Sequence, residues 1–304
     1  MKKTLSFIIV IIALFLLVAS YYLSIEILTP EKPSLVDEVD TKNQISFANF
    51  GLPEPETIRF QNGTLRLRGW YFKHSKKQNC GMILLHEFSD SKTQMLPYAS
   101  SFWKRGCSLF VFDARAHGES DGNYSTYGYH EKMDLERAVE YFSEIDNIPE
   151  DRIGIFGVGL GGATALQFAD GQFEYGFVIA DTPFRDMRSY VERTFSSLYS
   201  PAILLVTPLS LSMAELRGDL LVNDVSPQNT AKLIEKPVLI LVPNISEGQI
   251  KYDDAYMIFG NLKTKSKQLV QYTNSIGKLS SDQNSNSEYD TVIQDFLKEI
   301  QFGK

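Results

Sequence analysis

Three short segments, rich in glycine or polar residues, each follow a brief apolar run in this chain of 304 residues. They are His86-Glu87-Phe88, residues 113–120, and the glycine-rich run Gly157-Val158-Gly159-Leu160-Gly161-Gly162. Glycines at this spacing after an apolar run are typical of a tight strand-to-helix turn. Such a turn can present a nucleophile at its centre or hold an anion on backbone N–H groups. The residue types therefore point to one site built from three turns.

The apolar runs themselves predict buried strands at residues 82–85, 109–112, 153–156, 177–180, 238–242 and, more weakly, 269–272. None alternates apolar with polar residues, so both faces of each strand should be covered. Residues 131–145 predict a helix with one apolar face, formed by Met133, Leu135, Ala138, Val139 and Phe142. Repeated strand–helix–strand order predicts an α/β fold with a parallel sheet. The three polar segments would then meet at the carboxyl edge of that sheet.

Two segments depart from this repeating order. Residues 57–61 and 65–72 are separated by Asn62-Gly63, which signals a hairpin of strands. Residues 182–235 are too long for a simple crossover, and we expect helices inserted over the carboxyl edge as a cap. The second apolar stretch, at 201–213, lies in this insertion. A second membrane contact is the alternative for it, disfavoured by its short length and two prolines.

The ordered motifs together resemble the α/β-hydrolases, especially bacterial membrane-anchored members akin to serine aminopeptidases and dienelactone hydrolases. Further matching segments are residues 127–134, 180–184 and 225–227. The likeness covers about residues 57–300, and its specificity lies in the order and spacing of the motifs. It implies the α/β-hydrolase fold: a mostly parallel central sheet with helices on both faces, N-terminal hairpin strands and a helical cap. It also implies a site with a serine nucleophile, an acid and a histidine base.

The nucleophile of that site is missing here. The resemblance places a Gly-x-Ser-x-Gly turn at Gly157-Val158-Gly159-Leu160-Gly161, so the serine position is Gly159. Glycine has no hydroxyl and cannot form an acyl-enzyme. Glycine also adopts the strained dihedral angles of the turn at little cost, so the turn can persist without the reaction.

The base and the acid are missing as well. The four histidines are His74, His86, His117 and His130, and none follows residue 130, although the base should come last in the chain. The resemblance places the histidine near Gly277, followed by Lys278, and the acid near Ser246, with Glu247 one residue away. We therefore expect no catalytic residues and a degenerate triad.

The pocket side of the site should be formed by His86, Glu87, Phe88 and Leu160. In the resembling enzymes a glycine usually follows the histidine, whereas this chain has Glu87. A carboxylate near an oxyanion hole would oppose the charge that develops there during acyl transfer. This substitution favours the interpretation that hydrolysis has been lost.

Two other functions compete with this interpretation. The run Gly157-x-Gly159-x-x-Gly162, with Asp181 at the end of the next strand, also matches the dinucleotide-binding fingerprint. That fingerprint normally opens a nucleotide domain, whereas two strands precede it here. Alternatively, a residual ester or amide hydrolase would use a relocated nucleophile, for which Ser89, Ser91 and Ser246 are candidates.

The remaining polar residues have structural interpretations. We expect Asp113, Arg115 and His117 to hold their loop through internal hydrogen bonds, and His86 to bond neighbouring backbone. His130 should lie at the surface near a helix start, and His74, beside Lys76 and Lys77, in a solvated loop. No spacing of His, Cys and Asp suggests a metal site, and we expect no cofactor.

The N-terminus predicts a membrane segment. Lys2 and Lys3 precede an uncharged run at 5–23, long enough to cross a bilayer. The alternative is a cleaved signal peptide ending near Val18-Ala19-Ser20. Both interpretations export the domain, and an uncleaved helix would give a single-pass protein with its body on the extracytoplasmic side. We therefore divide the chain into an anchor (1–25), a linker (26–55) and a hydrolase-like domain (56–304).

Cys80 and Cys107 each stand six residues before a strand-end residue, His86 and Asp113 respectively. If these strands are parallel neighbours, the two thiols lie side by side. Export would permit a disulfide, and two free, half-buried thiols are the alternative.

The composition sets limits on the partners. A net charge of −7 without a basic stripe argues against nucleic acid. The favoured hypothesis is a membrane-anchored, catalytically inactive hydrolase-like protein. Its N-terminal helix would contact the membrane, and its pocket would bind a small molecule, a lipid or a protein.

Overall fold

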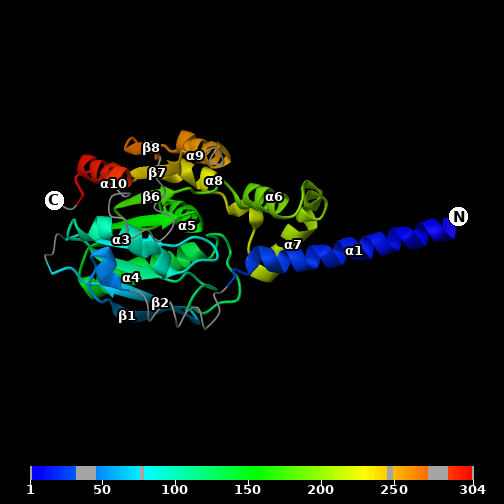
Figure 1. Cartoon of the computed structure of the whole chain (residues 1–304), viewed down its shortest axis with the longest axis horizontal. Helices are drawn as coiled ribbons and strands as arrows, with labels where there is room; N and C mark the ends of the chain where they lie inside the picture. Colours follow the sequence, from blue (N-terminus) through cyan, green and yellow to red (C-terminus); the bar gives the residue numbers. More distant parts are fainter. Residues whose placement is uncertain (1, 32–45, 76–78, 245–248, 273–286, 303–304) are drawn as a thin grey trace.

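The structure is a computed structural model that describes residues 2–31, 46–75, 79–244, 249–272 and 287–302. A long helix, α1 (Lys2–Leu28), projects from a rounded α/β body, with the helices of an insertion lying beside its second half (Figure 1). The helix continues three residues beyond the boundary expected at residue 25.

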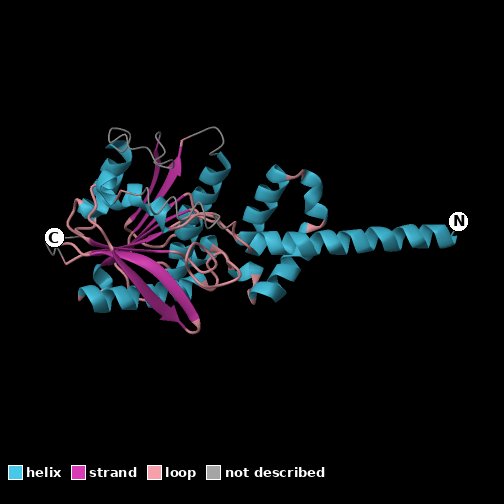
Figure 2. Ribbon diagram, turned by 60° about the horizontal axis from the view of Figure 1, so that its bottom comes forward, coloured by secondary structure: helices cyan, strands magenta, loops and turns pink. Residues whose placement is uncertain are grey.

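The described residues form one sheet of eight strands in the order β1-β2-β4-β3-β5-β6-β7-β8. These strands are β1 (Glu56–Asn62), β2 (Leu65–Phe72), β3 (Gly81–Leu85), β4 (Ser108–Phe112), β5 (Ile153–Val158), β6 (Phe177–Asp181), β7 (Val238–Pro243) and β8 (Lys267–Tyr272). The pairs β1–β2 and β2–β4 are antiparallel. The other neighbouring pairs, β4–β3, β3–β5, β5–β6, β6–β7 and β7–β8, are parallel. The predicted strands and hairpin are thus confirmed, and Figure 2 shows the twisted sheet with helices on both sides.

The parallel strands lack alternation because both of their faces are buried. Ile83 and Leu85 of β3 pack in one apolar cluster, whereas Met82 and Leu84 pack in the cluster on the opposite face. Successive side chains of a strand point to opposite faces, so a strand covered on both sides must be apolar throughout. The expectation of a doubly covered sheet is confirmed.

The helices that cover the sheet come from the crossovers and the C-terminal region. The α-helices after α1 are α3 (Leu96–Trp103), α4 (Glu131–Asp146), α5 (Leu160–Phe168), α6 (Met187–Leu198), α7 (Thr207–Gly218), α8 (Pro227–Thr230), α9 (Gln249–Asn261) and α10 (Ser287–Glu299). Short 3₁₀ helices are η1 (Phe47–Phe50), η2 (Lys92–Met95), η3 (Glu150–Arg152), η4 (Pro201–Leu205), η5 (Val222–Asp224) and η6 (Ala231–Leu233). Helices α4, α5 and α9 pack on one face of the sheet, and α3 and α10 on the other.

In helix α4, one residue of the predicted apolar face is not buried. Leu135, Ala138, Val139 and Phe142 are buried, but Met133 is 41% exposed. The buried positions follow the three- and four-residue spacing of one helix face, and a residue two positions before Leu135 points about 200° away from it.

The insertion between β6 and β7 forms the cap. It contains α6, η4, α7, η5, α8 and η6. Its apolar side chains, including Val191, Leu211 and Ala214, share one cluster with Leu23 and Ile27 of α1. The cap is therefore built on the end of the N-terminal helix as well as on the body.

Cys80 and Cys107 form a disulfide, with Cα atoms 4.8 Å apart. Strands β3 and β4 are parallel neighbours in which Gly81 pairs with Ser108, so the residues before them lie side by side. Both cysteines are buried, which excludes the alternative of two half-buried thiols.

Candidate functional site

The strand-to-helix turn between β5 and α5 keeps a strained shape. Gly159 adopts φ 51° and ψ −108°, outside the regions that side-chain-bearing residues favour. Its N–H donates to the carbonyl of Asp181 at 2.8 Å, and the N–H of Gly161 donates to the carbonyl of His86 at 3.1 Å. The turn that would raise a nucleophile is thus present, with a glycine at its centre.

The side chain of Glu87 fills the space above this turn. Its Oε1 accepts the backbone N–H groups of Phe88 at 2.7 Å and of Leu160 at 2.9 Å. One donor comes from the loop after β3 and the other from the residue after Gly159. These are the two positions that form an oxyanion hole in this kind of turn. The carboxylate therefore bonds directly to the two donors that the resemblance would assign to an oxyanion hole, whereas the sequence predicted only that it lies near them.

The same carboxylate also takes the place of a nucleophile side chain. A Cβ atom built on Gly159 would overlap both carboxylate oxygens of Glu87, far inside the 3.0 Å limit that real Cβ atoms respect. The backbone of Glu87 is also fixed, because its N–H donates to Oε1 of Gln94 at 2.8 Å. One carboxylate thus accepts both N–H groups and fills the space over Gly159.

A cavity of about 360 Å³ opens beside Glu87. Its lining residues are Glu87, Gly159, Thr182, Pro183, Phe184, Tyr190, Arg193, Thr194, Ser197, Leu198 and Asp254. Four of them, at positions 190, 193, 194 and 197, share one face of α6, so the cap covers the cavity. The sequence analysis missed these residues, although their three- and four-residue spacing was a signal that could have found them.

The cavity contains an ion pair in which the carboxylate is buried and the arginines are partly exposed. Arg193 donates to Oδ2 of Asp254, whose carboxylate is 2% exposed, and the guanidinium of Arg185 lies 3.6 Å from Oδ1. Burial raises the pKa of Asp254, while the two arginines act in the opposite direction. Burial and the charge of Glu87 raise the pKa of the Tyr190 hydroxyl. The cavity thus offers apolar walls together with a few polar groups, which is typical of small-molecule sites.

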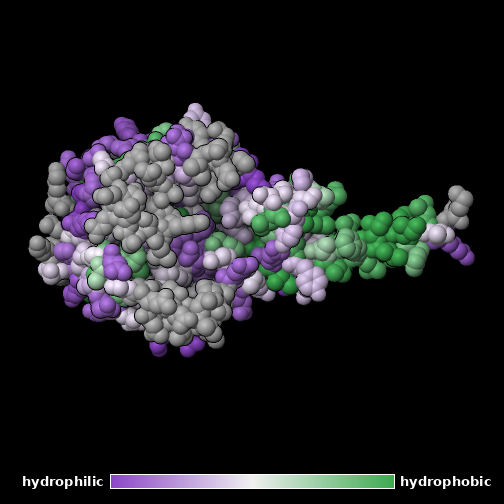
Figure 3. All heavy atoms as spheres, in the orientation of Figure 1, coloured by the Kyte–Doolittle hydropathy of each residue, from purple (hydrophilic) through white to green (hydrophobic). Residues whose placement is uncertain are grey.

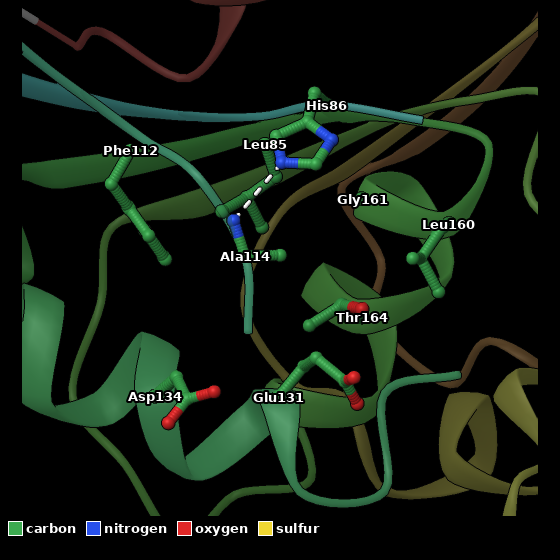
Figure 4. Close-up of a pocket in the computed structure, with 9 residues that line it drawn as sticks. All are labelled: Leu85, His86, Phe112, Ala114, Glu131, Asp134, Leu160, Gly161 and Thr164. Carbon is green, nitrogen blue, oxygen red and sulfur yellow. Dashed lines mark hydrogen bonds between the residues drawn. The ribbon is translucent and has the colours of Figure 1, made fainter. Parts of the chain in front are cut away.

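His86 is bonded on both ring nitrogens. Its Nε2 accepts the N–H of Ala114 at 3.0 Å (Figure 4). Its Nδ1 lies 2.8 Å from the carbonyl of Glu87. Burial, with the nearby His117, lowers the pKa of His86 to about 4. Both contacts are with backbone groups, as the sequence analysis expected for His86.

Two other histidines also have structural contacts. Nδ1 of His117 lies 2.8 Å from the carbonyl of Arg115, as expected for a residue that holds its loop. His130 precedes α4, and its Nε2 lies 2.8 Å from the carbonyl of Asp219, which links the body to the cap.

The expectation for His74 is wrong. Its ring packs on Trp103 with centroids 4.3 Å apart, and the residue is half-buried rather than solvated. The indole lies at the end of α3, a contact that the lysines beside His74 in sequence do not reveal.

Asp113 and Arg115 have the expected internal contacts. Asp113 accepts the N–H groups of Lys92 at 2.8 Å and Glu119 at 3.0 Å, and the ammonium of Lys92 reaches the same carboxylate. Arg115 forms a bidentate ion pair with Asp134, with Nε 2.6 Å from Oδ2 and Nη2 2.7 Å from Oδ1. These bonds fix the loop beside the site.

The serine candidates are engaged with other partners or lie elsewhere. Oγ of Ser89 accepts the N–H of Glu31 at 3.1 Å, and Oγ of Ser91 lies 2.8 Å from the hydroxyl of Thr93. The expected acid region at Ser246 and Glu247 and the expected base region at Gly277 and Lys278 lie outside the described residues.

Asp181 ends β6 directly behind the turn. Its carboxylate accepts the hydroxyls of Tyr289 at 2.8 Å and Tyr272 at 3.1 Å, so it faces β8 and α10. Among the described residues, no group of three or more His, Cys, Asp or Glu side chains is arranged to hold a metal ion.

Comparisons with known proteins identify the architecture. The Pyrococcus furiosus esterase Pf2001 superposes with a TM-score of 0.65 over 89% of this chain and 97% of that chain, at 20% identity. The α/β-hydrolase GrgF from Penicillium sp. sh18 gives 0.61 over 83% of this chain and 100% of that chain, also at 20% identity. This protein has the α/β-hydrolase fold.

Sequence relatives match a smaller part of the chain. The uncharacterized protein YqkD of Bacillus subtilis (strain 168) is 31% identical over 162 residues, which are 53% of each chain. The chain thus spans about half the length of the curated relatives it matches. No family model matches the sequence. The protein is therefore described as an α/β-hydrolase-fold protein with an N-terminal apolar helix long enough to cross a membrane.

Proposed function

We propose that this protein is a membrane-anchored α/β-hydrolase-fold binding protein that does not hydrolyse its ligand. The observation that carries the proposal is the position of Glu87, whose carboxylate accepts the N–H groups of Phe88 and Leu160. A transition state for acyl transfer needs those donors for its developing negative charge. A resident carboxylate removes them and adds a like charge.

The other catalytic groups support the same conclusion. Gly159 supplies no hydroxyl, and no histidine follows residue 130 in the sequence. His86 is neutral and bonded through both ring nitrogens. Loss of one triad member leaves some rate because the oxyanion hole still acts, but here the hole is also filled.

The cavity beneath α6 is the proposed binding site. Its volume of about 360 Å³ suits a small organic molecule. Arg193 and Asp254 provide a donor and an acceptor, and Oδ1 of Asp254 accepts no hydrogen bond from the described residues. Polar groups of a ligand would meet Arg193 and Asp254, while Phe184 and Leu198 would contact its apolar part.

Helix α1 is the proposed anchor. Within residues 3–28, an 18-residue window has a mean hydropathy of 2.7 and exposes most of its side chains, as a lipid-facing helix does. Lys2 and Lys3 would stay on the cytoplasmic side and direct the body outward. The disulfide between Cys80 and Cys107 supports an oxidising compartment outside the cytoplasm.

Dinucleotide binding is a weaker hypothesis in this geometry. The N–H of Leu160 at the start of α5, where a pyrophosphate would bind, already donates to Glu87. Asp181, which would bind a ribose, is engaged by two tyrosine hydroxyls.

The test uses the purified full-length chain in detergent. We expect hydrolysis of p-nitrophenyl acetate and butyrate at the uncatalysed rate and no covalent labelling by a fluorophosphonate probe. An active esterase of the same fold is the positive control. A labelled serine, located by peptide mass spectrometry, would overturn the proposal and identify a relocated nucleophile. A thermal shift with NAD or NADP would favour the dinucleotide hypothesis.

A further inference from the structure

The second half of α1 is part of the folded body. Leu23, Ile27 and Leu28 are buried in the apolar cluster of the cap. The hydroxyl of Tyr127 donates to the carbonyl of Ile27 at 2.7 Å, and the N–H of Ser125 donates to that of Leu28 at 2.8 Å. The end of the helix is thus packed against the body.

Helices α1 and α7 lie side by side and run in the same direction (Figures 1 and 2). Near the start of α7, the hydroxyl of Ser20 lies 3.4 Å from the carbonyl of Val206. At the other end, Leu28 packs beside Gly218. The first turn of α7, and η4 before it, therefore lie level with residues 16–20 of α1.

The length of α1 places this level inside a bilayer. A helix rises about 1.5 Å per residue, so residues 3–15, which precede the first contact with the cap cluster at Leu16, span only about 20 Å. The hydrocarbon core is about 30 Å thick and needs about 20 residues. With Lys3 at the cytoplasmic interface, the far boundary falls near residue 23. Residues 16–20 and the cap segment beside them would lie below that boundary.

The cap has the composition that this depth requires. Residues 194–214 contain no charged residue and no histidine. This segment exposes large apolar side chains to the outside of the protein, most of all Leu205 at 80% and Leu198 at 66%. The exposed group, which we name the cap apolar surface, consists of Leu198, Tyr199, Leu204, Leu205 and Leu209. Figure 3 shows apolar atoms of the cap continuing those of α1.

Polar and aromatic contacts appear at the level where the boundary is expected. The hydroxyl of Tyr199 donates to Glu26, the first acidic residue of α1. The guanidinium of Arg217 lies 4.3 Å from the ring centre of Tyr21. Tyrosines with nearby charges are typical of the interface between lipid and water.

We propose that the cap apolar surface is immersed in the outer leaflet of the membrane that α1 crosses. The inference rests on the proposed anchoring by α1. It adds a second membrane contact made by η4 and the start of α7, which sequence alone disfavoured. Leu198 belongs both to this surface and to the lining of the cavity, so the binding site lies at the edge of the leaflet.

The test places a fluorescent bimane on a single introduced cysteine in the full-length chain, reconstituted in phosphatidylcholine vesicles. Both native cysteines are in the disulfide, so the new thiol is labelled selectively. For Leu205→Cys we expect loss of fluorescence when the vesicles carry acyl-chain nitroxides, and protection from aqueous iodide. Leu209→Cys is a second probe of the same surface, in case the first variant folds poorly.

Two matched sites make the outcome decisive. Leu233→Cys is 58% exposed on η6, the end of the insertion, where Ala231 and Ile234 pack in the apolar cluster of the sheet and not in that of α1. Its bimane should respond to iodide and not to nitroxide lipid. Phe15→Cys, 70% exposed on α1, should respond to nitroxide lipid. If the bimane at position 15 is quenched by nitroxide lipid and the bimane at position 205 by iodide, α1 crosses the membrane but the cap is not immersed in it. If Leu205 is protected from both quenchers, another protein surface covers it and the proposal also fails. If Phe15 is not quenched by lipid, the anchor itself is wrong.

Discussion

The carboxylate of Glu87 stands directly over Gly159, in the volume that a side chain at position 159 would need. The two residues are linked through the N–H of Leu160, which donates to Oε1 of Glu87 at 2.9 Å. The absence of a side chain at one position and the presence of a carboxylate at the other are therefore mutually dependent. A serine at position 159 requires the carboxylate of Glu87 to move away from the turn.

This dependence predicts strong coupling between substitutions. Gly159→Ser should destabilise the fold by about 1–3 kcal/mol, because the new side chain overlaps Glu87. In the background of Glu87→Gly the same substitution should cost less, which gives a coupling energy on the order of 1–3 kcal/mol. Urea unfolding of the four proteins measures it.

The matched control for this cycle is Gly63→Ser. Gly63 has φ +56°, close to that of Gly159, but a Cβ there would meet nothing within 4 Å. It carries the backbone strain without the overlap and should show no coupling to Glu87→Gly. Equal coupling at both glycines would mean that Glu87 does not fill the turn. Neither Gly159→Ser alone nor the double variant should hydrolyse esters, because no histidine follows residue 130 in the sequence.

His86 predicts a pH dependence of stability. Its pKa of about 4 in the folded state lies below the value near 6.5 of an unfolded histidine. As the pH falls, the unfolded chain binds the proton first, so the His86 contribution to the free energy of unfolding decreases between about pH 6.5 and 4. It is constant above that window, and its slope reaches at most about 1.4 kcal/mol per pH unit.

An NMR titration checks this prediction directly. The His86 imidazole signal, assigned by its loss in His86→Gln, should titrate near pH 4 in the folded protein and near the ordinary value in urea. The unfolding free energy of His86→Gln should fall less steeply than that of the parent over the same window. A folded-state midpoint near 6.5 would show that His86 is not held neutral by its surroundings.

The disulfide should contribute to stability through the loop it closes. Cys80 and Cys107 are 27 residues apart, and closing a loop of this size stabilises by about 3.5 kcal/mol in the chain-entropy description. Reduction should lower the urea midpoint by a corresponding amount. The Cys80→Ser/Cys107→Ser variant should match the reduced parent and be insensitive to reductant. If reduction leaves the midpoint unchanged, the bridge is not formed in the folded protein.

The junction of α1 with the cap can be tested by two identical substitutions in one helix. Ile27 is fully buried, so Ile27→Ala should destabilise the fold by about 2–4 kcal/mol through lost packing. Ile12 is 52% exposed, so Ile12→Ala should leave the stability of the body nearly unchanged. Thermal unfolding of both variants in the same detergent compares them. Equal midpoints would mean that α1 is not packed into the cap.

The sequence alone determined the strands, the hairpin, the existence of the cap and the glycine at the centre of the turn. These features depend on residues that are adjacent in the sequence. Strand β3, for example, is apolar throughout because both of its faces are buried, so its five consecutive residues are enough to predict it. The periodicity also identified most of the buried face of α4, and it failed only at Met133, which lies off the spacing of that face.

Tertiary structure decided where side chains point and which distant segments meet. Glu87 and Leu160 are 73 residues apart, and Ser20 and Val206 are 186 apart, so no local pattern relates them. Composition identified α1 as an apolar helix, but the contacts with α7 showed that its second half is part of the cap. Likewise, the sequence showed a glutamate near the oxyanion hole, and only packing directed its carboxylate onto two specific N–H groups. Hydrogen bonds between remote segments depend on the whole fold, and the chemistry of this site depends on such bonds.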